Sequence, residues 1–473
     1  MLSLILINSN LSKMNHKKFD RRSVMKTLGL ITVASAMPTV NVFSKESGLN
    51  IKSNFEKGHQ TSSRPVTAIV LGAGVRGWSV YSSFGLKYPD ELQVVGVAEP
   101  IPYRRERISK AFNIPEKNQF VTWEDVFKRP KFADAIVITT PDDLHYGPAM
   151  AGLQMGYHLL LEKPIAQTWK ECNDILKLTE KKNAVVAVCH VLRYTPYFRK
   201  IKEIIDSGEI GELVSVEHLE PVSYLRMTHG YVRGSWRNTK TSNSMLLAKS
   251  CHDTDILRWL INKPCTRVSS FGSLKYFKKE NAPHGAPLRC TDGCPAEREC
   301  SFSAIRIYLE MRYGLNRLNL EAVNDETILR ELKNGPYGRC VFHCDNDVVD
   351  HQVAIFEFEN QITVSFSMIG FSHYEGRRTR IFATKGNLFG DEQTLTTTQL
   401  LTGKQEKWDV SMANIDSGHG GGDHALAHDF VQAVRLNDPS YLTSTMRASM
   451  ASHLMGFQAD VSRIKGTVEK VNL

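Results

Sequence analysis

The sequence lacks the features that mark several protein classes. After residue 45 it has no stretch of about 20 apolar residues, the length that a membrane-spanning helix needs. It contains no internal repeat, no zinc-finger spacing and no interleaving of aromatic and basic residues of the kind that binds nucleic acids. We therefore expect no membrane span and no nucleic-acid partner.

A strong charge of one sign is also missing from most of the chain. Residues 1–45 account for +6 of the formal net charge of +9, so the rest of the sequence is only mildly basic. The hydrophobic fraction of 42% and the charged fraction of 23% are those of an ordinary globular protein. A chain of 473 residues is long enough for two or three domains with cores of their own.

The N-terminal 45 residues have the pattern of an export signal. Arg21 and Arg22 are followed by an apolar residue and a lysine, as in twin-arginine signals, and the apolar segment 28–40 comes next. Export by that route carries proteins that have already folded, often around a tightly held cofactor. We expect residues 1–45 to direct the protein to the periplasm and residues 46–64 to form a linker. The alternative is a basic N-terminal tail on a cytoplasmic protein.

Strands and helices alternate between residues 65 and 190. Short apolar runs such as 66–71 are separated by segments with helical patterning, which predicts a doubly wound parallel sheet of the Rossmann type over 65–190. After residue 190, alternating strands such as 353–359 predict a second domain, 191–473, with a largely antiparallel open sheet. The expected fold class is α/β.

A glycine-rich turn lies between the first predicted strand and the helix after it. Gly72, Gly74 and Gly77 have the G-x-G-x-x-G spacing. The first glycine permits a tight turn, the second lets pyrophosphate approach the backbone, and the third lets the helix pack on the strand. The N–H groups at the helix start, from Val75 and Arg76 onward, then face the phosphates. The turn predicts a bound nicotinamide dinucleotide.

Glu99 ends the second predicted strand, 22 residues after Gly77. A carboxylate at this place accepts hydrogen bonds from the adenosine ribose hydroxyls and repels a 2′-phosphate, so it favours NAD over NADP. Arg104 and Arg105 lie close by and weaken this preference, because arginine can pair with a 2′-phosphate. We expect NAD as the cofactor, with NADP as the less favoured alternative.

Four motifs together resemble the Gfo/Idh/MocA family of oxidoreductases. They are the glycine turn, Thr140-Pro-Asp-Asp-Leu-His145, Leu161-Glu-Lys-Pro164 and Ser250-Cys-His-Asp-Thr-Asp-Ile-Leu-Arg-Trp-Leu260, in matching order and spacing. The resemblance implies a Rossmann domain joined to an open α/β sheet domain, with the nicotinamide between them facing a sugar or a cyclitol. Because the open sheet commonly pairs subunits in relatives, it also implies a homo-oligomer.

The ends of two further strands supply expected site residues. Thr140 and Pro141 end a strand at the edge where ligands bind in such sheets, and His145 can stack on the cofactor or bond to it. The alternative for His145 is a surface position at a helix start. Glu162 and Lys163 follow the next strand end and are expected at the cofactor. The Lys163 ammonium can also stabilise a developing alkoxide, so we expect it to be catalytic.

His252 is the expected general acid or base. Dehydrogenases of the family that this chain resembles often carry an aspartate four residues before that histidine, but the position is Ala248 here. Lys249 and Asp253 flank His252 and are the expected catalytic substitutes, with Lys249 as a second cation near the substrate oxygen. The alternative is that His252 is a packed structural histidine.

Three further side chains are expected on the substrate. Trp236 and Arg237 combine an aromatic face with a guanidinium group, which suits stacking on a sugar and hydrogen bonding to it. Asp255 belongs to the same predicted helix as His252. The alternative for Trp236 is a buried side chain in an exposed turn, and the alternative for Asp255 is a charge on a helix face.

Three of the nine cysteines, Cys290, Cys294 and Cys300, fall in one segment that contains Gly and Pro. An exported protein can form disulfides there, and the cluster also permits a zinc site with three thiolates and a fourth ligand. The spacing matches no common zinc or iron–sulfur pattern. Disulfides, a structural metal and free thiols all remain open, and no cysteine is expected to be a nucleophile.

Two functions fit these residues. The first is an NAD(P)-dependent dehydrogenase that oxidises a hydroxyl of a sugar, a sugar derivative or a cyclitol, with Lys163 and His252 handling the proton. The second is a glycoside hydrolase that uses NAD without net redox change, through a transient keto-sugar. Export favours the second somewhat, because a recycled cofactor needs no external supply.

Overall fold

The computed structural model describes residues 64–318, 320–413, 415 and 417–472. The predicted export signal and all of the predicted linker except Arg64 lie outside these residues. The described residues belong to one compact unit. No helix among the described residues is both long and apolar enough to cross a membrane.

The first sheet has six parallel strands. They are β1 (Val66–Leu71), β2 (Leu92–Ala98), β3 (Gln119–Phe120), β4 (Ala135–Ile138), β5 (His158–Leu161) and β6 (Val186–Val188), in the spatial order β3-β2-β1-β4-β5-β6. The order reverses direction between β1 and β4, and ligands bind at such a reversal, beyond the carboxyl ends of the strands. This is the predicted Rossmann sheet.

Helices cover this sheet on both faces, so its central strands are apolar along their whole length. All four residues of β4 are buried. The helices of this part are α1 (Ser83–Lys87), α2 (Pro102–Phe112), α3 (Trp123–Val126), α4 (Tyr146–Gln154) and α5 (Trp169–Lys182), and a π-helical segment, Val75–Ser82, precedes α1.

The second sheet has nine strands and is largely antiparallel, as predicted. They are β7 (Leu213–Ser223), β8 (Cys265–Ser273), β9 (His351–Phe358), β10 (Thr363–Ser372), β11 (Arg378–Ala383), β12 (Gly386–Gly390), β13 (Thr394–Gln399), β14 (Gln405–Asp409) and β15 (Glu469–Lys470). Only β7 and β10 pair in parallel. Buried and accessible residues alternate along β9 and β10, which is typical of a sheet with one covered face.

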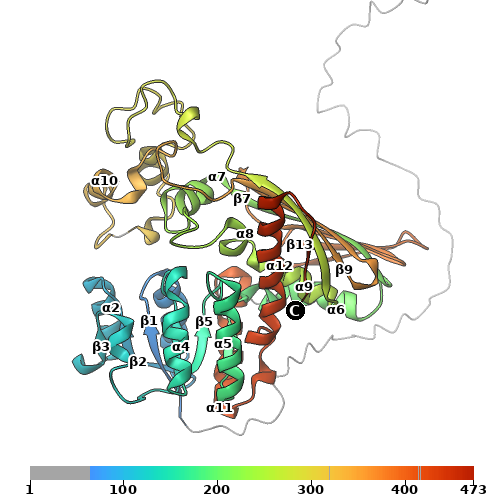
Figure 1. Cartoon of the computed structure of the whole chain (residues 1–473), viewed down its shortest axis with the longest axis horizontal. Helices are drawn as coiled ribbons and strands as arrows, with labels where there is room; N and C mark the ends of the chain where they lie inside the picture. Colours follow the sequence, from blue (N-terminus) through green and yellow to red (C-terminus); the bar gives the residue numbers. More distant parts are fainter. Residues whose placement is uncertain (1–63, 319, 414, 416, 473) are drawn as a thin grey trace, which may run out of the picture. The chain divides into compact units, whose positions relative to one another are not determined.

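The remaining helices are α6 (Pro196–Asp206), α7 (Tyr224–Arg226), α8 (Met245–Ala248), α9 (Cys251–Ile261), α10 (Asp325–Asn334), α11 (Gly422–Leu436) and α12 (Met446–Lys465). The long helix α12 contacts β8 and α9 of the second sheet domain and also α5 of the first (Figure 1). It therefore ties the two domains together.

Helix α11 belongs to the first domain by its packing, although the sequence placed it in the second. Its buried residues Leu426, Phe430 and Val431 share one apolar core with Val70 of β1 and Phe84 of α1. The spacing of four residues between Leu426 and Phe430 puts both on one helix face. The segment 191–473 is thus not a single independent domain.

Candidate active site

The glycine turn has the geometry that a dinucleotide requires. Gly72 has a φ of +89°, and a Cβ there would lie 2.6 Å from the carbonyl oxygen of Thr139. A Cβ on Gly77 would lie 2.0 Å from the carbonyl oxygen of Gly72. At Gly74, by contrast, a Cβ would meet nothing closer than 3.9 Å. Two glycines therefore close the turn, and the third leaves the backbone open to a phosphate group at the start of the helical segment.

Glu99 is buried beside this turn. Its Oε2 accepts a hydrogen bond from the backbone N–H of Ala73 at 2.6 Å, and its Oε1 accepts one from Ile101 at 2.9 Å. A carboxylate oxygen can accept more than one hydrogen bond, so Glu99 can also receive ribose hydroxyls. Arg105 donates to the backbone oxygen of Glu99, whereas Arg104 lies next to Gly74. Of these two arginines, Arg104 is therefore the one beside the turn.

The side chain of Arg76 is committed to two carboxylates. Its Nε lies 2.5 Å from Oε1 of Glu162, and its Nη1 lies 2.9 Å from Oδ1 of Asp423. The hydroxyl of Tyr81 also donates to Glu162, at 3.0 Å. The side chains of Arg76 and Glu162 therefore hold the turn against α11. The contacts predicted between these two residues and the cofactor would be made by their backbones.

Lys163 joins the two domains at the site. It follows β5, and its Nζ donates a hydrogen bond to the carbonyl oxygen of Ala248 in α8 at 2.7 Å. The same ammonium lies 5.9 Å from the ring centre of Trp236. Trp236 in turn donates from Nε1 to Oδ1 of Asp142 at 3.1 Å. The structure thus brings Lys163 and Trp236 together, as a substrate site for a hydroxylated ring requires.

His145 does not occupy the surface position that was one of its two expected placements. It is buried, with Nδ1 2.7 Å from the carbonyl oxygen of Pro164 and Nε2 3.1 Å from that of Thr140. The imidazole therefore bridges the ends of β4 and β5 from inside the protein and is no surface histidine. The Thr140 hydroxyl donates to Leu144, and Pro141 is exposed at the same strand end. Their contacts with a cofactor remain predictions.

His252 lies on α9 and is buried. Burial, together with the charge of Lys163, holds the pKa of His252 well below its ordinary value, so the ring is neutral. Among the described residues its Nδ1 has no hydrogen-bond partner. The ring centre lies 6.1 Å from that of His190 and 6.0 Å from that of His419. The expected partners of His252, Lys249 and Asp253, point elsewhere.

Lys249 and Asp253 belong to a buried ion-pair network. Lys249 lies 3.0 Å from Glu220, and Arg377 bridges Glu220 at 2.7 Å and Asp253 at 2.5 Å. Burial alone would raise the pKa of Asp253, but Arg377 and the hydrogen bond with His218 hold it below its usual range. A carboxylate fixed in this way exchanges no proton near neutral pH. The expectation that Asp253 is catalytic is therefore wrong; it is a fixed charge that anchors α9.

Two expected substrate contacts are also occupied by protein groups. Both oxygens of Asp255 lie 2.6 Å from the Arg193 guanidinium, and Asp255 is buried. Arg237 holds Asp345 at 2.7 and 3.1 Å. These arginine–carboxylate pairs use the two-pronged geometry that favours arginine at such positions. Asp255 and Arg237 thus stabilise the fold around the site instead of lining it with free groups.

Sequence reasoning missed His419 and Asp423. His419 lies in a short turn, His419–Gly421, before α11, and its Nδ1 is 3.0 Å from Oδ2 of Asp423. The His419 side chain is 44% exposed and the Asp423 side chain only 3%. The signal was present as Gly418-His-Gly-Gly-Gly-Asp423, a glycine-rich loop with a histidine and a carboxylate four residues apart.

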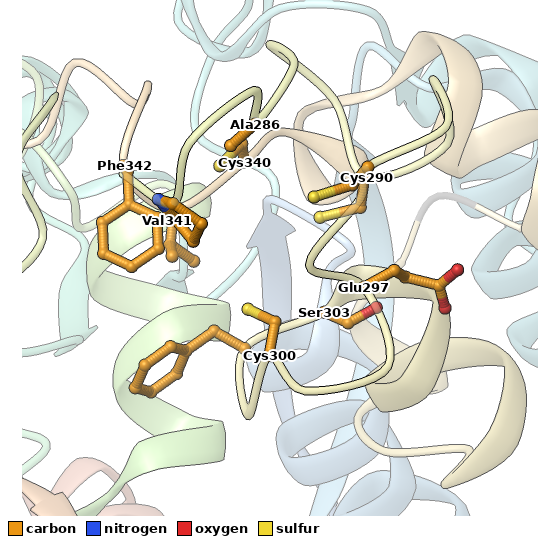
Figure 2. Close-up of a pocket in the computed structure, with 11 residues that line it drawn as sticks. Ala286, Cys290, Glu297, Cys300, Ser303, Cys340, Val341 and Phe342 are labelled. Carbon is orange, nitrogen blue, oxygen red and sulfur yellow. The ribbon is translucent and has the colours of Figure 1, made fainter. Parts of the chain in front are cut away.

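The cysteine cluster lies around a cavity of its own (Figure 2). Cys290, Cys294, Cys300 and Cys340 line it together with apolar side chains. All nine cysteines lie in the described part of the chain and are free thiols there. The described residues contain no group of three or more His, Cys, Asp or Glu side chains placed to hold a metal ion.

Residues 66–190 match the model of an "Oxidoreductase family, NAD-binding Rossmann fold", and residues 198–389 match the "GFO/IDH/MocA C-terminal domain". The chain belongs to the Gfo/Idh/MocA family. Its first domain is the NAD-binding Rossmann domain of that family. The fold, the family and the cofactor class predicted from the sequence are thereby confirmed.

Curated relatives in the family are distant. YteT of Bacillus subtilis (strain 168), named as an oxidoreductase without a stated substrate, is 25% identical over 72% of this chain and 83% of its own length. The scyllo-inositol 2-dehydrogenase (NAD(+)) of the same organism is 26% identical over 44% of this chain and 58% of its own length.

Two solved structures show the same fold. A levoglucosan dehydrogenase in complex with NADH and levoglucosan covers 87% of this chain and 100% of its own, with a TM-score of 0.65 and 18% identity. An inositol dehydrogenase homologue from Azotobacter vinelandii, in complex with NADH and myo-inositol, covers 86% and 98%, with a TM-score of 0.61 and 13% identity.

Proposed function

We propose that this oxidoreductase is an NAD-dependent dehydrogenase that oxidises one ring hydroxyl of a cyclitol or a sugar derivative. The observation that carries the proposal is the position of Lys163. Lys163 follows the end of β5 in the cofactor domain, and its ammonium donates to the carbonyl oxygen of Ala248 in α8. The ammonium also lies near His252 and over the ring of Trp236. Family members named as inositol and levoglucosan dehydrogenases support the substrate class.

The residues of this chain divide the work. Bound NAD supplies the acceptor for the hydride of the carbinol carbon. The glycine turn and Glu99 hold the dinucleotide, and Arg104 is the group that can admit a 2′-phosphate. Lys163 donates a hydrogen bond to the substrate oxygen and stabilises its developing negative charge. A histidine accepts the hydroxyl proton, and the two candidates are His252, beside Lys163, and His419, whose ring centre lies 6.0 Å from that of His252.

The test is to incubate the purified protein with NAD and, separately, with scyllo-inositol, myo-inositol and levoglucosan, and to follow NADH. We expect stoichiometric NADH and a keto product from at least one of them. Aryl glycosides without added NAD form the second arm, because they report the hydrolase alternative. Aglycone release without net NADH would overturn the proposal in favour of that alternative, which none of the relatives reported above suggests by name.

We also propose that residues 1–45 export the protein. The support is the Arg21-Arg22 pair and the apolar segment after it. Periplasmic and cytoplasmic fractions of cells that express the full chain should differ between the wild type and the double variant Arg21→Lys, Arg22→Lys. We expect the wild type in the periplasm and the variant in the cytoplasm; equal distribution of the two would contradict export by this signal.

The open face of the second sheet supports a homo-oligomer. Phe271 of β8 pairs with Val353 of β9, and these side chains are 69% and 43% exposed, with Ile355 at 55% on the same strand. We propose that a second copy of the chain covers them. Light scattering should give a multiple of the 53.3 kDa chain mass, less any removed signal, and Phe271→Lys with Val353→Lys should reduce it to one chain. A monomeric wild type would refute the proposal.

A further inference from the structure

We propose that His419, oriented by Asp423, is the general acid–base of this enzyme, in place of His252. The inference rests on the dehydrogenase function proposed above and names the atom that takes the proton, Nε2 of His419. The pair also repeats the spacing that is missing around His252, since a carboxylate and a histidine again stand four residues apart, in the opposite order.

The two histidines are neighbours with different surroundings. Their ring centres are 6.0 Å apart. His252 is 6% exposed, and among the described residues its Nδ1 meets no acceptor that would fix the ring. His419 is 44% exposed and has a carboxylate on Nδ1. A base must be accessible and hold one tautomer; His419 is accessible, and the carboxylate on its Nδ1 fixes the tautomer.

Asp423 fixes that tautomer. An ionised carboxylate only accepts hydrogen bonds, so Nδ1 of His419 carries the hydrogen and Nε2 keeps a free lone pair. Burial alone would raise the pKa of Asp423, but the hydrogen bond from His419 and the charge of Arg76 hold it below its usual range. Asp423 therefore stays ionised throughout the neutral range and stabilises the imidazolium that forms.

The loop is shaped to hold the pair together. His419 itself has a φ of +47°, a left-handed conformation that few side chains adopt. A Cβ on Gly418 would lie 2.6 Å from Oδ2 of Asp423, so only glycine admits the carboxylate there. Strained backbone that the surrounding structure maintains is concentrated at functional sites. The strain here falls on the residue that we assign to catalysis.

The pair is also tied to the cofactor turn. Arg76, inside the turn, reaches Asp423 at 2.9 Å and Glu162 at 2.5 Å, next to Lys163 in the chain. One chain of ion pairs thus positions both Lys163 and His419 relative to the turn. In the forward reaction the hydroxyl proton passes to Nε2 of His419 while the carbinol hydride passes to NAD; the products are a carbonyl, NADH and an imidazolium.

The kinetic experiment compares His419→Asn, Asp423→Asn and His252→Asn with the control His428→Asn. Asparagine tolerates the left-handed backbone at 419, and His428 pairs with Glu91 at 2.7 Å, outside the site. We expect kcat/KM to fall about 10²- to 10³-fold in His419→Asn and about tenfold in Asp423→Asn. The control should match the wild type, and NAD affinity should change less than threefold in the three histidine variants.

The dependence of activity on pH distinguishes His419 from His252 more directly. A rise of activity with pH in the direction of oxidation reports the catalytic base, and this rise should vanish in His419→Asn while it persists in His252→Asn. The charged and titratable groups that face His419 are Asp423, whose carboxylate Arg76 also pairs, and His252. If His252→Asn loses the rise and His419→Asn keeps it, with kcat/KM near the wild type, the inference is wrong and the dehydrogenase function stands.

A readout without turnover separates the two proposals. In protein labelled with ¹⁵N-histidine, the resonances of His419 are those lost in His419→Asn. We expect the Nδ1-protonated tautomer in the wild type, its loss in Asp423→Asn, and a shift on adding NADH. An Nε2-protonated His419 would overturn the inference even if a substrate is oxidised. If none of the probes is oxidised but the tautomer is as expected, the dehydrogenase proposal fails and the oriented pair remains.

Discussion

The cofactor side and the substrate side of this site are built in different ways. The cofactor side, the turn 72–77 with Glu99, falls within one strand–helix–strand unit. The substrate side, Lys163, His252 and His419, is drawn from the end of β5, from α9 and from the loop before α11. The cofactor side is shaped by close backbone contacts at its glycines and braced by Arg76, whereas the substrate side is assembled from distant segments that buried ion pairs hold. Substitutions on the cofactor side should therefore change nucleotide affinity, whereas substitutions on the substrate side should change turnover or the free energy of unfolding.

The largest effect should come from the residue where the two sides meet. Lys163→Met keeps the length of the side chain but removes the ammonium that reaches Ala248. We expect kcat/KM to fall at least about 10³-fold, because the charge on the substrate oxygen loses its partner. NAD affinity, measured by calorimetry, should change less than threefold. Lys170→Met, on the exposed start of α5, is the matched control, and a Lys163→Met enzyme with near-normal turnover would remove the basis of the proposed function.

A long-range ion pair comes next. Arg193→Met leaves Asp255 buried without its guanidinium partner, and such uncompensated charges cost about 3 to 4 kcal/mol of the free energy of unfolding. Urea denaturation of the two proteins measures this loss. The exposed pair Arg267 with Glu357 provides the comparison, because Arg267→Met should cost less than about 1 kcal/mol. Equal losses would mean that the substrate side is not held by its buried charges.

The substrate side should also weaken in acid. Burial lowers the pKa of His190 to about 4 and that of His453 to about 3, so both are neutral in the folded protein. Unfolded chains bind these protons near pH 6.5, so the stabilisation is present above that pH and is lost as the pH falls toward the folded values. Each histidine should lower the free energy of unfolding by about 2 kcal/mol at pH 5 relative to pH 7.

The check is urea denaturation at both pH values in the wild type and in His453→Gln. The dependence on pH should shrink in His453→Gln. A wild type with the same free energy of unfolding at pH 7 and pH 5 would show that these rings are not held neutral.

The smallest effect should lie on the cofactor side. Glu99→Gln removes the negative charge beside the turn but keeps the shape of the side chain. We expect the ratio of NADP to NAD affinity to rise about tenfold, since the repulsion of a 2′-phosphate is lost while Arg104 remains. Glu106→Gln, exposed on α2, should leave the ratio unchanged. A ratio that does not move in Glu99→Gln would mean that Glu99 acts only through its bonds to Ala73 and Ile101.

The sequence predicted the cofactor side of the site better than the substrate side. The parallel sheet, the turn and the strand ends were predictable because strand and turn patterns are local. The roles of Asp253 and Asp255 were not, because a helix pattern shows which residues share a face but not that Arg377 and Arg193 approach that face. His419 was not predictable from the pattern around His252, because it lies far along the chain, in the turn before α11, and its carboxylate partner lies in the first turn of α11.

The packing of α11 bears on how the protein is made. The core around β1 stays open until Leu426, Phe430 and Val431 have left the ribosome. The cofactor domain, although encoded early, can finish folding only when synthesis is nearly over. Shortened chains that end near residue 190 should stay on chaperones instead of binding nucleotide. If the N-terminal segment directs export of the folded protein only, export can begin only after the last helices have been synthesised and packed.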